Sequence, residues 1–338
     1  TAPVYTPEAI IYSMGAIPMG VWGADIQLSQ SKQYFPAFIC SIMQSILELG
    51  MTGVYKGASA IVIPSLCDSL KCLGENWKYA VKDIPFIPMT YPQHRKPQFG
   101  YDYCKAGYEK VIKELEKSTG LSFDDGKLSE AVALYNEHAQ AMQQYSDLVE
   151  KHPEVSCAQR NSVFKSAWFM DRAEHLAILK ELISALENEE PGAPKKKIIT
   201  SGILCDSPEL LKIFDEYGFS IVADDVAAES RQYKYEAPKG NTGLDKLTDK
   251  FCSRNNCSVL YDVNKDRVSM LADMAVEKKA DGIIVVLTKF CDPEEFDYPM
   301  IKKACNEKGV QCLLIEVDRQ MDNMGKARTM IDAFEAMI

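Results

Sequence analysis

The sequence predicts an α/β protein with two doubly wound, Rossmann-like lobes, whose parallel sheets are joined by a helical layer. Strand-sized apolar runs alternate with amphipathic helical stretches toward both ends of the chain, which is typical of βαβ units. The region between them is rich in Ala, Leu, Glu and Lys and contains no convincing strand. A chain of 338 residues is also long enough for two cores. We therefore expect an N-terminal lobe at residues 1–120, a helical layer and linker at 121–190, and a C-terminal lobe at 191–338.

The N-terminal lobe is expected to alternate between strands and helices. Its predicted elements, in chain order, are an apolar run at residues 16–22, a helix at 34–49, a strand at 60–66, a helix that runs through Trp77, and an apolar run at 84–89. Gly50 closes the first of these helices. Two prolines make the last run an edge strand or an extended segment, because proline cannot donate a hydrogen bond to a neighbouring strand.

The helical layer is predicted from three long stretches of helical composition, at residues 101–118, 127–151 and 163–187. A break follows at residues 189–197, where proline, glycine and a reversal of charge occur together. Such a composition is typical of a linker between domains.

The C-terminal lobe resumes the alternation of strands and helices. Its predicted strands lie at residues 197–204, 219–223, 282–290 and 310–318, and its predicted helices lie near 242–251, 265–279 and 323–338, with two more that begin at Ser207 and Asp292. Ser207 is followed by Pro208 and Glu209. This is a favourable helix start, because the serine caps the helix and the proline fits its first turn.

Composition and charge argue against several classes of function. A net charge of −10 and a pI near 5.1 argue against nucleic acid as the main partner, because binding of phosphates needs a concentrated basic surface. The longest apolar runs are strand-sized, so we expect no transmembrane helix and no membrane partner. The first residues have neither a basic region nor an apolar core. We therefore expect no signal peptide and a cytoplasmic protein.

Several catalytic motifs are missing from the sequence. It contains no glycine-rich loop of the P-loop or dinucleotide type and no Gly-x-Ser-x-Gly elbow. This removes ATP hydrolysis, NAD chemistry and serine catalysis from the leading hypotheses. The four histidines are too dispersed for a His-rich metal centre. His138 and His175 lie in polar helical stretches, and we expect them to be solvated.

Two of the eleven cysteines occupy positions that are typical of a binding site. Cys67 and Cys291 each follow directly on an apolar run and precede an aspartate, and ligands of open α/β sheets gather outside the carboxyl ends of the strands. Cys40 lies at the start of an apolar helix, whose positive end favours thiolate. The scattered spacing of the eleven thiols fits no disulfide framework.

Three interpretations of these thiols stay open from the residues alone. The three thiols named above could hold an iron–sulfur cluster with one iron free of protein ligands. The pairs Cys67/Cys72 and Cys252/Cys257 have a spacing within the loose range of zinc sites. Free cysteine is also among the most buried residue types, so every thiol could be a small core side chain.

Five stretches of the sequence resemble the 2-hydroxyacyl-CoA dehydratase family, which also includes subunits of benzoyl-CoA reductase. They lie at residues 3–8, 33–44, 63–77, 222–226 and 289–299 and together span nearly the whole chain. The similarity is greatest to the smaller (β) subunit of dehydratases that act on 2-hydroxyisocaproyl-CoA, 2-hydroxyglutaryl-CoA and similar thioesters. Family chains usually carry a further helical segment before the stretch at Pro3. A truncated, divergent or specialised member is therefore expected.

The resemblance implies two α/β lobes with a 4Fe–4S cluster between them, held by Cys40, Cys67 and Cys291, with Cys72 as a competitor for the second place. It also implies a homologous α subunit with its own 4Fe–4S cluster, which binds the acyl-CoA substrate, and it leaves room for a flavin in the complex. A separate ATP-hydrolysing iron–sulfur activator would inject one electron, which the β cluster relays. A ketyl radical would then expel the 2-hydroxyl group of an (R)-2-hydroxyacyl-CoA to give a 2-enoyl-CoA.

Three other functions are compatible with the sequence. Two belong to the same superfamily: a homodimeric reductase of the double-cubane type, and a subunit like those of benzoyl-CoA reductase, both ATP-dependent. The third is a non-enzymatic α/β binding protein in which all cysteines are core residues. Iron and sulfide content separates the third from the others, because core cysteines hold neither.

Overall fold

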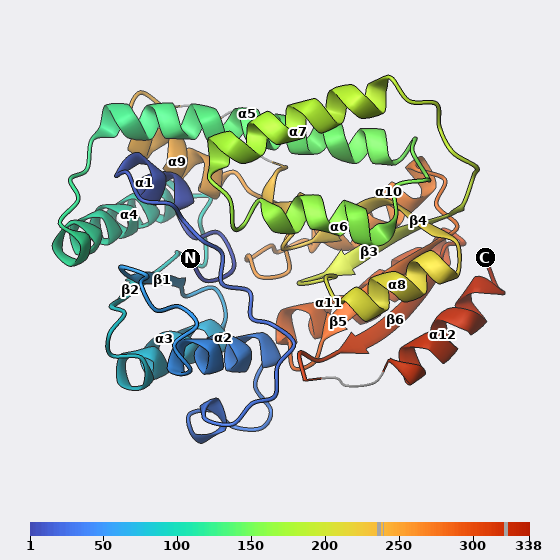
Figure 1. Ribbon diagram of the computed structural model, residues 1–338, viewed down its shortest axis with the longest axis horizontal. Helices are drawn as coiled ribbons and strands as arrows, with labels where there is room; N and C mark the ends of the chain where they lie inside the picture. Colours follow the sequence, from blue (N-terminus) through green and yellow to red (C-terminus); the bar gives the residue numbers. More distant parts are fainter. Residues whose placement is uncertain (235–237, 239, 321–323) are drawn as a thin grey trace.

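The computed structural model describes residues 1–234, 238, 240–320 and 324–338, and it confirms the predicted α/β class. It contains a parallel sheet of two strands near the N-terminus and a parallel sheet of four strands near the C-terminus. Long helices lie above both sheets in the view of Figure 1. This arrangement agrees with two Rossmann-like lobes and a helical layer, and the N-terminal lobe has the smaller sheet. No helix of the described residues is long and apolar enough to cross a membrane.

The elements of the N-terminal lobe are the parallel strands β1 (Ile61–Pro64) and β2 (Phe86–Met89), the helices α1 (Glu8–Ser13), α2 (Ser41–Met51) and α3 (Asp68–Ala80), and the short 3-10 helix η1 (Ser31–Gln33). Leu70, Leu73 and Trp77 form the buried face of α3, at the spacing of three and four residues that one side of a helix presents. The Trp77 indole Nε1 donates a hydrogen bond to the carbonyl oxygen of Ile84, 2.9 Å away. This contact ties α3 to the segment before β2.

Two expectations for this lobe are wrong. Residues 16–22, all of them within the described ranges, form no strand. Their backbone bonds to segments outside any sheet, as the N–H group of Gly20 does to the carbonyl oxygen of Trp168. The helix that follows begins only at Ser41. Pro36 lies in the turns before it, and a proline disfavours the helical conformation of the residue that precedes it.

The central helices are α4 (Gln98–Thr119), α5 (Asp125–Val149), α6 (Cys157–Ser166) and α7 (Arg172–Glu187). The single helix predicted at 163–187 is wrong, because the chain turns between α6 and α7. The carboxylate of Asp171 starts α7 by accepting hydrogen bonds from the backbone N–H groups of Ala173 and Glu174, as a strong N-cap does. Helix α5 packs against α7, α1 and α9 (Gly243–Cys252). Both ends of the chain thus contribute to the helical layer, and the division at residues 120 and 190 stays a prediction.

The C-terminal sheet has four parallel strands in the order β4-β3-β5-β6. They are β3 (Lys196–Gly202), β4 (Phe219–Val226), β5 (Gly282–Thr288) and β6 (Gln311–Val317), and each confirms a predicted strand to within a few residues. The other elements are α8 (Pro208–Glu216), α10 (Asp266–Glu277), α11 (Asp292–Glu307), α12 (Gly325–Glu335) and the 3-10 helix η2 (Ser230–Gln232). Asn323, the predicted first residue of the last helix, lies outside the described residues.

Helices cover both faces of this sheet, as a doubly wound fold requires. All seven residues of β5 are buried, and successive side chains of a strand point to opposite faces. Ile283 and Val285 pack with residues of α10 and α11, whereas Ile284 and Val286 belong to the core that includes residues of α8 and α12. A short run of buried apolar residues therefore predicts a central parallel strand.

The order of the strands creates a crevice at the carboxyl edge of this sheet. From β3 the chain moves outward to β4, and it returns to the other side of β3 to form β5. Ligands of doubly wound sheets bind at such a switch point, outside the carboxyl ends of the two central strands. Cys291 follows three residues after the last residue of β5.

Candidate functional site

Three of the cysteines occupy the same position in their local structure, because each is the N-cap residue of a helix. Cys40 precedes α2, Cys67 precedes α3 and Cys291 precedes α11. The second and third of them come just after a buried strand and just before an aspartate. A helix N-terminus presents backbone N–H groups without intrahelical partners and a partial positive charge. It therefore favours a negatively charged sulfur.

The three thiols line one cavity of about 670 Å³. Cys40 and Cys67 come from the N-terminal lobe and Cys291 from the C-terminal lobe, so the cavity lies between the two lobes. Ile203, directly after β3, also lines it, and the cavity therefore includes the switch point of the C-terminal sheet. Much of the remaining lining is apolar, including Val4, Ile42, Met43, Leu66, Leu70 and Phe290.

The structure keeps the other candidate thiols out of this cavity. Cys72 is exposed on α3 and does not belong to the lining that the described residues form. Cys252 lies beside Cys104 of α4, with which it shares a hydrogen bond. Cys257 instead accepts a hydrogen bond from Arg231 Nη1 at 3.8 Å. The two thiols of the Cys252/Cys257 pair thus have different neighbours.

Burial dominates the pKa values of the three cavity thiols. It raises the pKa of Cys40 to about 12, and it raises the pKa values of Cys67 and Cys291 as well. The neighbouring sulfurs add to this effect, since Cys40 and Cys67 both raise the pKa of Cys291. With nothing bound, all three thiols are therefore protonated at neutral pH.

Backbone N–H groups of the three helices act against burial. The donors are those of Ile42 and Met43 for Cys40, of Leu70 and Ser69 for Cys67, and of Glu294 for Cys291. Each of them lowers the pKa of its thiol. Hydrogen bonds to sulfur stabilise the thiolate ligands of metal centres. The sulfurs are thus prepared to become thiolates when a cationic group supplies the missing charge.

Among the described residues, no group of three or more Cys, His, Asp or Glu side chains has the arrangement that one ion requires. The sulfur ligands of a zinc ion all lie about 2.3 Å from it. An iron–sulfur cluster instead places its own iron and sulfide atoms between the thiolates. Three helix N-termini around one cavity, each with a thiol, are compatible with thiolates that surround such a cluster.

The backbone that leads to Cys291 has an unusual conformation. Phe290 has a φ of 62°, in the left-handed region that residues other than glycine rarely adopt. Such a conformation persists only where the surrounding structure holds it, and it is frequent at ligand sites. Both Phe290 and Cys291 line the cavity.

A buried network of ion pairs holds the first turns of α11, just after Cys291. Its carboxylates are Glu294 and Asp297 on α11 and Asp225 near the end of β4, all at most 1% exposed. Arg267 of α10 donates to all three, over distances of 2.7 to 3.0 Å. Arg231 of η2 pairs with Glu294 at 3.2 Å and with Asp225 at 2.9 Å. Burial would raise the pKa values of Glu294 and Asp225, but the guanidinium charges outweigh burial and lower these pKa values.

Sequence reasoning missed this network, because its members lie on four separate segments of the chain. The only signals were the acidic first turn of α11 and the pair Asp224–Asp225 after an apolar run, and neither identifies a partner. The network fixes α11 against the sheet and with it the backbone of Cys291.

The expectation that His138 and His175 are solvated is wrong. Both are buried, with exposed fractions of 1% and 4%, and His138 Nε2 lies 2.9 Å from His175 Nδ1. Burial lowers the pKa of His138 to about 2 and also lowers that of His175, so both rings are neutral. The polar sequence of α5 and α7 suggested exposure to water. The two histidines are buried instead, because each ring provides a hydrogen-bond partner for the other between the packed helices.

Known proteins are similar in sequence to this chain over nearly its whole length. A family model described as 2-hydroxyglutaryl-CoA dehydratase, D-component, matches residues 3–338. The (R)-phenyllactyl-CoA dehydratase beta subunit of Clostridium sporogenes is 46% identical over 98% of this chain and 89% of its own length. The lactoyl-CoA dehydratase subunit beta of Anaerotignum propionicum is 36% identical over 99% and 90%. The (R)-2-hydroxyglutaryl-CoA dehydratase subunit beta of Acidaminococcus fermentans is 34% identical over 98% and 90%.

Proposed function

The chain belongs to the 2-hydroxyglutaryl-CoA dehydratase D-component family, and from this premise we propose that it is the β subunit of an (R)-2-hydroxyacyl-CoA dehydratase. The family and the named relatives make it an enzyme chain of the lyase class. One observation carries the more specific proposal. Three thiols from both lobes, each at a helix N-terminus, line one largely apolar cavity.

Cys40, Cys67 and Cys291 are proposed to hold a 4Fe–4S cluster as thiolates. The volume of about 670 Å³ and the N–H donors at each sulfur support this assignment. When bound, such a cluster supplies one-electron transfer. The residues of the chain hold the three sulfurs, offset their negative charge with helix N-termini and exclude water with apolar side chains such as Ile203 and Leu66.

The chain is proposed to relay an electron, while a partner subunit binds the substrate. The three named relatives are beta subunits, which supports an α subunit as the partner; a cluster of its own on that homologous subunit is part of the proposal. The sequence has no phosphate-binding loop for ATP, so a separate ATP-dependent iron–sulfur activator is part of the proposal, and so is a flavin in the complex. The overall reaction converts a 2-hydroxyacyl-CoA into a 2-enoyl-CoA and water. All eleven cysteines are free thiols, which suits a reducing cytoplasm as its compartment.

The test is anaerobic purification of the chain with an α-type partner, followed by iron and sulfide analysis and an activity assay. The assay contains the activator, ATP and one of three thioesters: phenyllactyl-CoA, lactoyl-CoA or 2-hydroxyglutaryl-CoA. We expect about four irons per chain and release of an enoyl-CoA from at least one thioester. The chain without its partner should release none.

Two outcomes would contradict parts of this proposal. Steady turnover by the lone chain would replace the relay by a homodimeric enzyme of the reductase type. Full turnover by a complex whose β chain contains no iron would exclude the cluster.

A further inference from the structure

A buried carboxylate lies just behind one of the three cavity thiols. Glu294 is the third residue of α11, whose N-cap is Cys291, and its side chain is 0% exposed. The carboxylates in the described lining of the cavity belong to Asp68, Asp262 and Asp292, and these residues are exposed or half-buried. Water and salt screen charges at such positions far more than a charge that is fully buried. The charge of Glu294 therefore acts on the cavity with little screening.

One hydroxyl group connects Glu294 with the cavity. Ser258 lines the cavity, and its Oγ donates a hydrogen bond to Glu294 Oε1, 2.7 Å away. The same oxygen accepts a hydrogen bond from Arg231 Nη1 at 3.1 Å. A guanidinium group can only donate, so the single proton of the hydroxyl group points to Glu294. The carboxylate is thus separated from the cavity by one small side chain.

Two guanidinium groups keep Glu294 ionised at neutral pH. Arg231 and Arg267 pair with it at 3.2 and 2.9 Å and lower its pKa. Both arginines also pair with Asp225, at 2.9 and 2.7 Å, so their positive charge is shared between several carboxylates. The negative charge of Glu294 still reaches the site, because it raises the pKa of the Cys291 thiol. A charge that opposes a thiolate also opposes an added electron.

We propose that the Glu294 carboxylate lowers the reduction potential of the cluster that Cys40, Cys67 and Cys291 are proposed to hold. Reduction makes the cluster more negative, and a buried negative charge one side chain away from the cavity opposes that step. Glu294 is neither a ligand nor in contact with substrate, and it acts through its electric field alone. The inference rests on the proposed function, because it requires the cluster to be present.

The test is an anaerobic redox titration of the full chain with its cluster, followed by EPR spectroscopy and visible absorbance. Glu294→Gln removes the charge and keeps the size of the side chain, so we expect the midpoint potential to rise. At the midpoint of the unchanged chain, the ratio of reduced to oxidised cluster should be roughly tenfold higher, which is about 59 mV for a one-electron step. Glu294→Asp keeps the charge and should stay near the unchanged potential. A midpoint potential does not depend on how many chains hold a cluster, so a partial loss of iron leaves the comparison valid.

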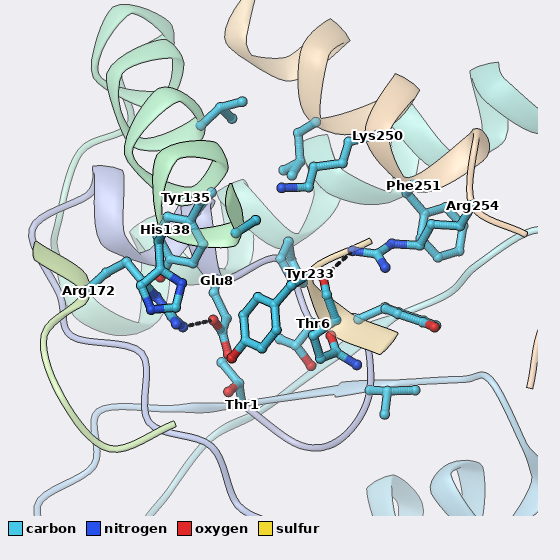
Figure 2. A pocket seen from close by; sticks show the side chains of 18 of the residues that line it. Thr1, Thr6, Glu8, Tyr135, His138, Arg172, Tyr233, Lys250, Phe251 and Arg254 are labelled. Atoms are coloured by element: carbon cyan, nitrogen blue, oxygen red, sulfur yellow. Dashed lines mark hydrogen bonds and ion pairs between the residues drawn. The ribbon is translucent and has the colours of Figure 1, made fainter. Parts of the chain in front are cut away.

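Two control variants remove a carboxylate elsewhere. Glu295→Gln changes the next residue of the same helix turn, which is exposed, so the potential should stay unchanged because solvent screens that charge. Glu8→Gln breaks an ion pair with Arg172, whose atoms lie 2.7 Å apart (Figure 2). This pair lies beside a separate cavity of about 100 Å³, whose described lining contains no cysteine. The shift for Glu8→Gln should therefore be much smaller than that for Glu294→Gln.

The variant Lys265→Met separates charge from distortion. Lys265 lines the cavity and pairs with Asp297 at 2.7 Å, with its side chain 40% exposed. Removal of its positive charge should lower the potential, and by less than Glu294→Gln raises it, because water reaches the ammonium group. Shifts of opposite sign are expected from a loss of charge and not from a loosened cavity. The exposed position of Lys265 keeps the test decisive if Glu294→Gln fails to hold a cluster.

Three results would overturn this inference. They are an unchanged or lower potential of Glu294→Gln, a shift of the same size for Glu295→Gln or Glu8→Gln, and a potential of Lys265→Met that stays or rises. Each of them leaves the iron content of the chain as proposed, so they contradict the role of Glu294 alone. A chain without iron would instead contradict the proposed function, and this inference with it.

Discussion

At the scale of the residue, the place of a cysteine in its helix decides what its sulfur can do. The three cavity cysteines are N-cap residues, and their sulfurs accept hydrogen bonds from backbone N–H groups. Other buried thiols pair with each other instead, as Cys305 of α11 does with Cys312 of β6. A buried thiol with only a thiol for a neighbour behaves as a small apolar side chain. One residue type thus serves two purposes in this chain.

Substitution of single cysteines tests this distinction. We expect Cys40→Ala, Cys67→Ala and Cys291→Ala each to lose the visible absorbance of the cluster and most of its iron. Cys252→Ala and Cys305→Ala remove buried thiols outside the cavity, and both should keep the absorbance. Cys72→Ala should also keep it. A Cys72→Ala chain that loses the absorbance while Cys67→Ala retains it would reverse the assignment of the second ligand.

A second residue gives the chain an acid-sensitive contact. The Glu48 carboxylate accepts hydrogen bonds from Ser29 Oγ at 2.6 Å and from the backbone N–H groups of Gln30 and Ser31 at 2.9 and 2.7 Å. Burial would raise the pKa of Glu48, but these hydrogen bonds outweigh it and lower the pKa to about 2. The folded pKa lies below the unfolded value. The contact is therefore fully stabilising above the unfolded pKa and is lost as the pH falls through the folded one.

Urea unfolding at a series of pH values measures this contribution. Between about pH 5 and pH 3 the unchanged chain should lose stability more steeply than Glu48→Gln, whose side chain does not titrate. Glu137→Gln, at an exposed pair with Lys180, should follow the unchanged chain. Equal slopes for the unchanged chain and Glu48→Gln would show that Glu48 titrates alike in the folded and unfolded states.

At the scale of the element, helix α11 shows how charge positions a site. Its first turn carries three acidic residues, and acids at a helix N-terminus are stabilising by themselves. Two of the acidic side chains of α11, Glu294 and Asp297, are nevertheless buried and paired with Arg267. The acidic residues therefore favour the start of the helix, and the ion pairs with Arg267 fix the helix in place.

Replacing Arg267 by methionine should be severely destabilising. The change leaves three buried carboxylates short of a partner, which typically costs about 3–5 kcal/mol, and it should also lower the cluster content by loosening the start of α11. Urea unfolding and iron analysis measure the two effects. Arg328→Met breaks an exposed pair with Glu216 and should change neither quantity appreciably. A stable Arg267→Met chain with full iron content would show that the ion pairs of Arg267 do not position the start of α11.

The sequence predicted elements where local signals agree and failed where distant contacts decide. The strands of the C-terminal sheet were predicted because a strand that is buried on both faces consists of consecutive apolar residues, and the sequence shows such a run directly. The break between α6 and α7 has a local signal as well, since Asp171 and Glu174 form the spacing of a capping pair, but the helical composition on either side obscured it. The pairing of His138 with His175 and the network around Arg267 depend on tertiary contacts, which no local pattern specifies.

At the scale of the whole molecule, the two lobes meet where the cysteine cavity lies. Arg319, just after β6, pairs with Asp206 of its own lobe at 2.9 Å and with Asp25 of the N-terminal lobe at 3.0 Å. Its backbone N–H group also donates to the hydroxyl oxygen of Ser41, 3.1 Å away, next to Cys40. Two of the three cavity thiols, Cys40 and Cys67, thus belong to one lobe, and Cys291 belongs to the other.

Exposure to air tests the site in the assembled protein. A cluster with three protein thiolates leaves one iron open to attack by oxygen. We expect air to bleach the visible absorbance and abolish dehydratase activity, and anaerobic iron and sulfide to restore part of both. Zinc is inert to oxidation, and buried thiols oxidise slowly. A colourless, air-exposed complex with full activity would rule out the cluster.

The division of the three thiols between the lobes also has a consequence for biosynthesis. Cys67 and Cys291 are separated by 224 residues (291 − 67), which a ribosome needs about 10 to 45 seconds to translate at 5–20 residues per second. During that interval the nascent chain carries two of the three thiols but not the wall that completes the cavity. Completion of the proposed cluster would therefore have to follow translation of Cys291. A nascent chain that bound the proposed cluster earlier would hold it by two thiols only. A chain truncated before its last fifth lacks Cys291 and should not retain the cluster.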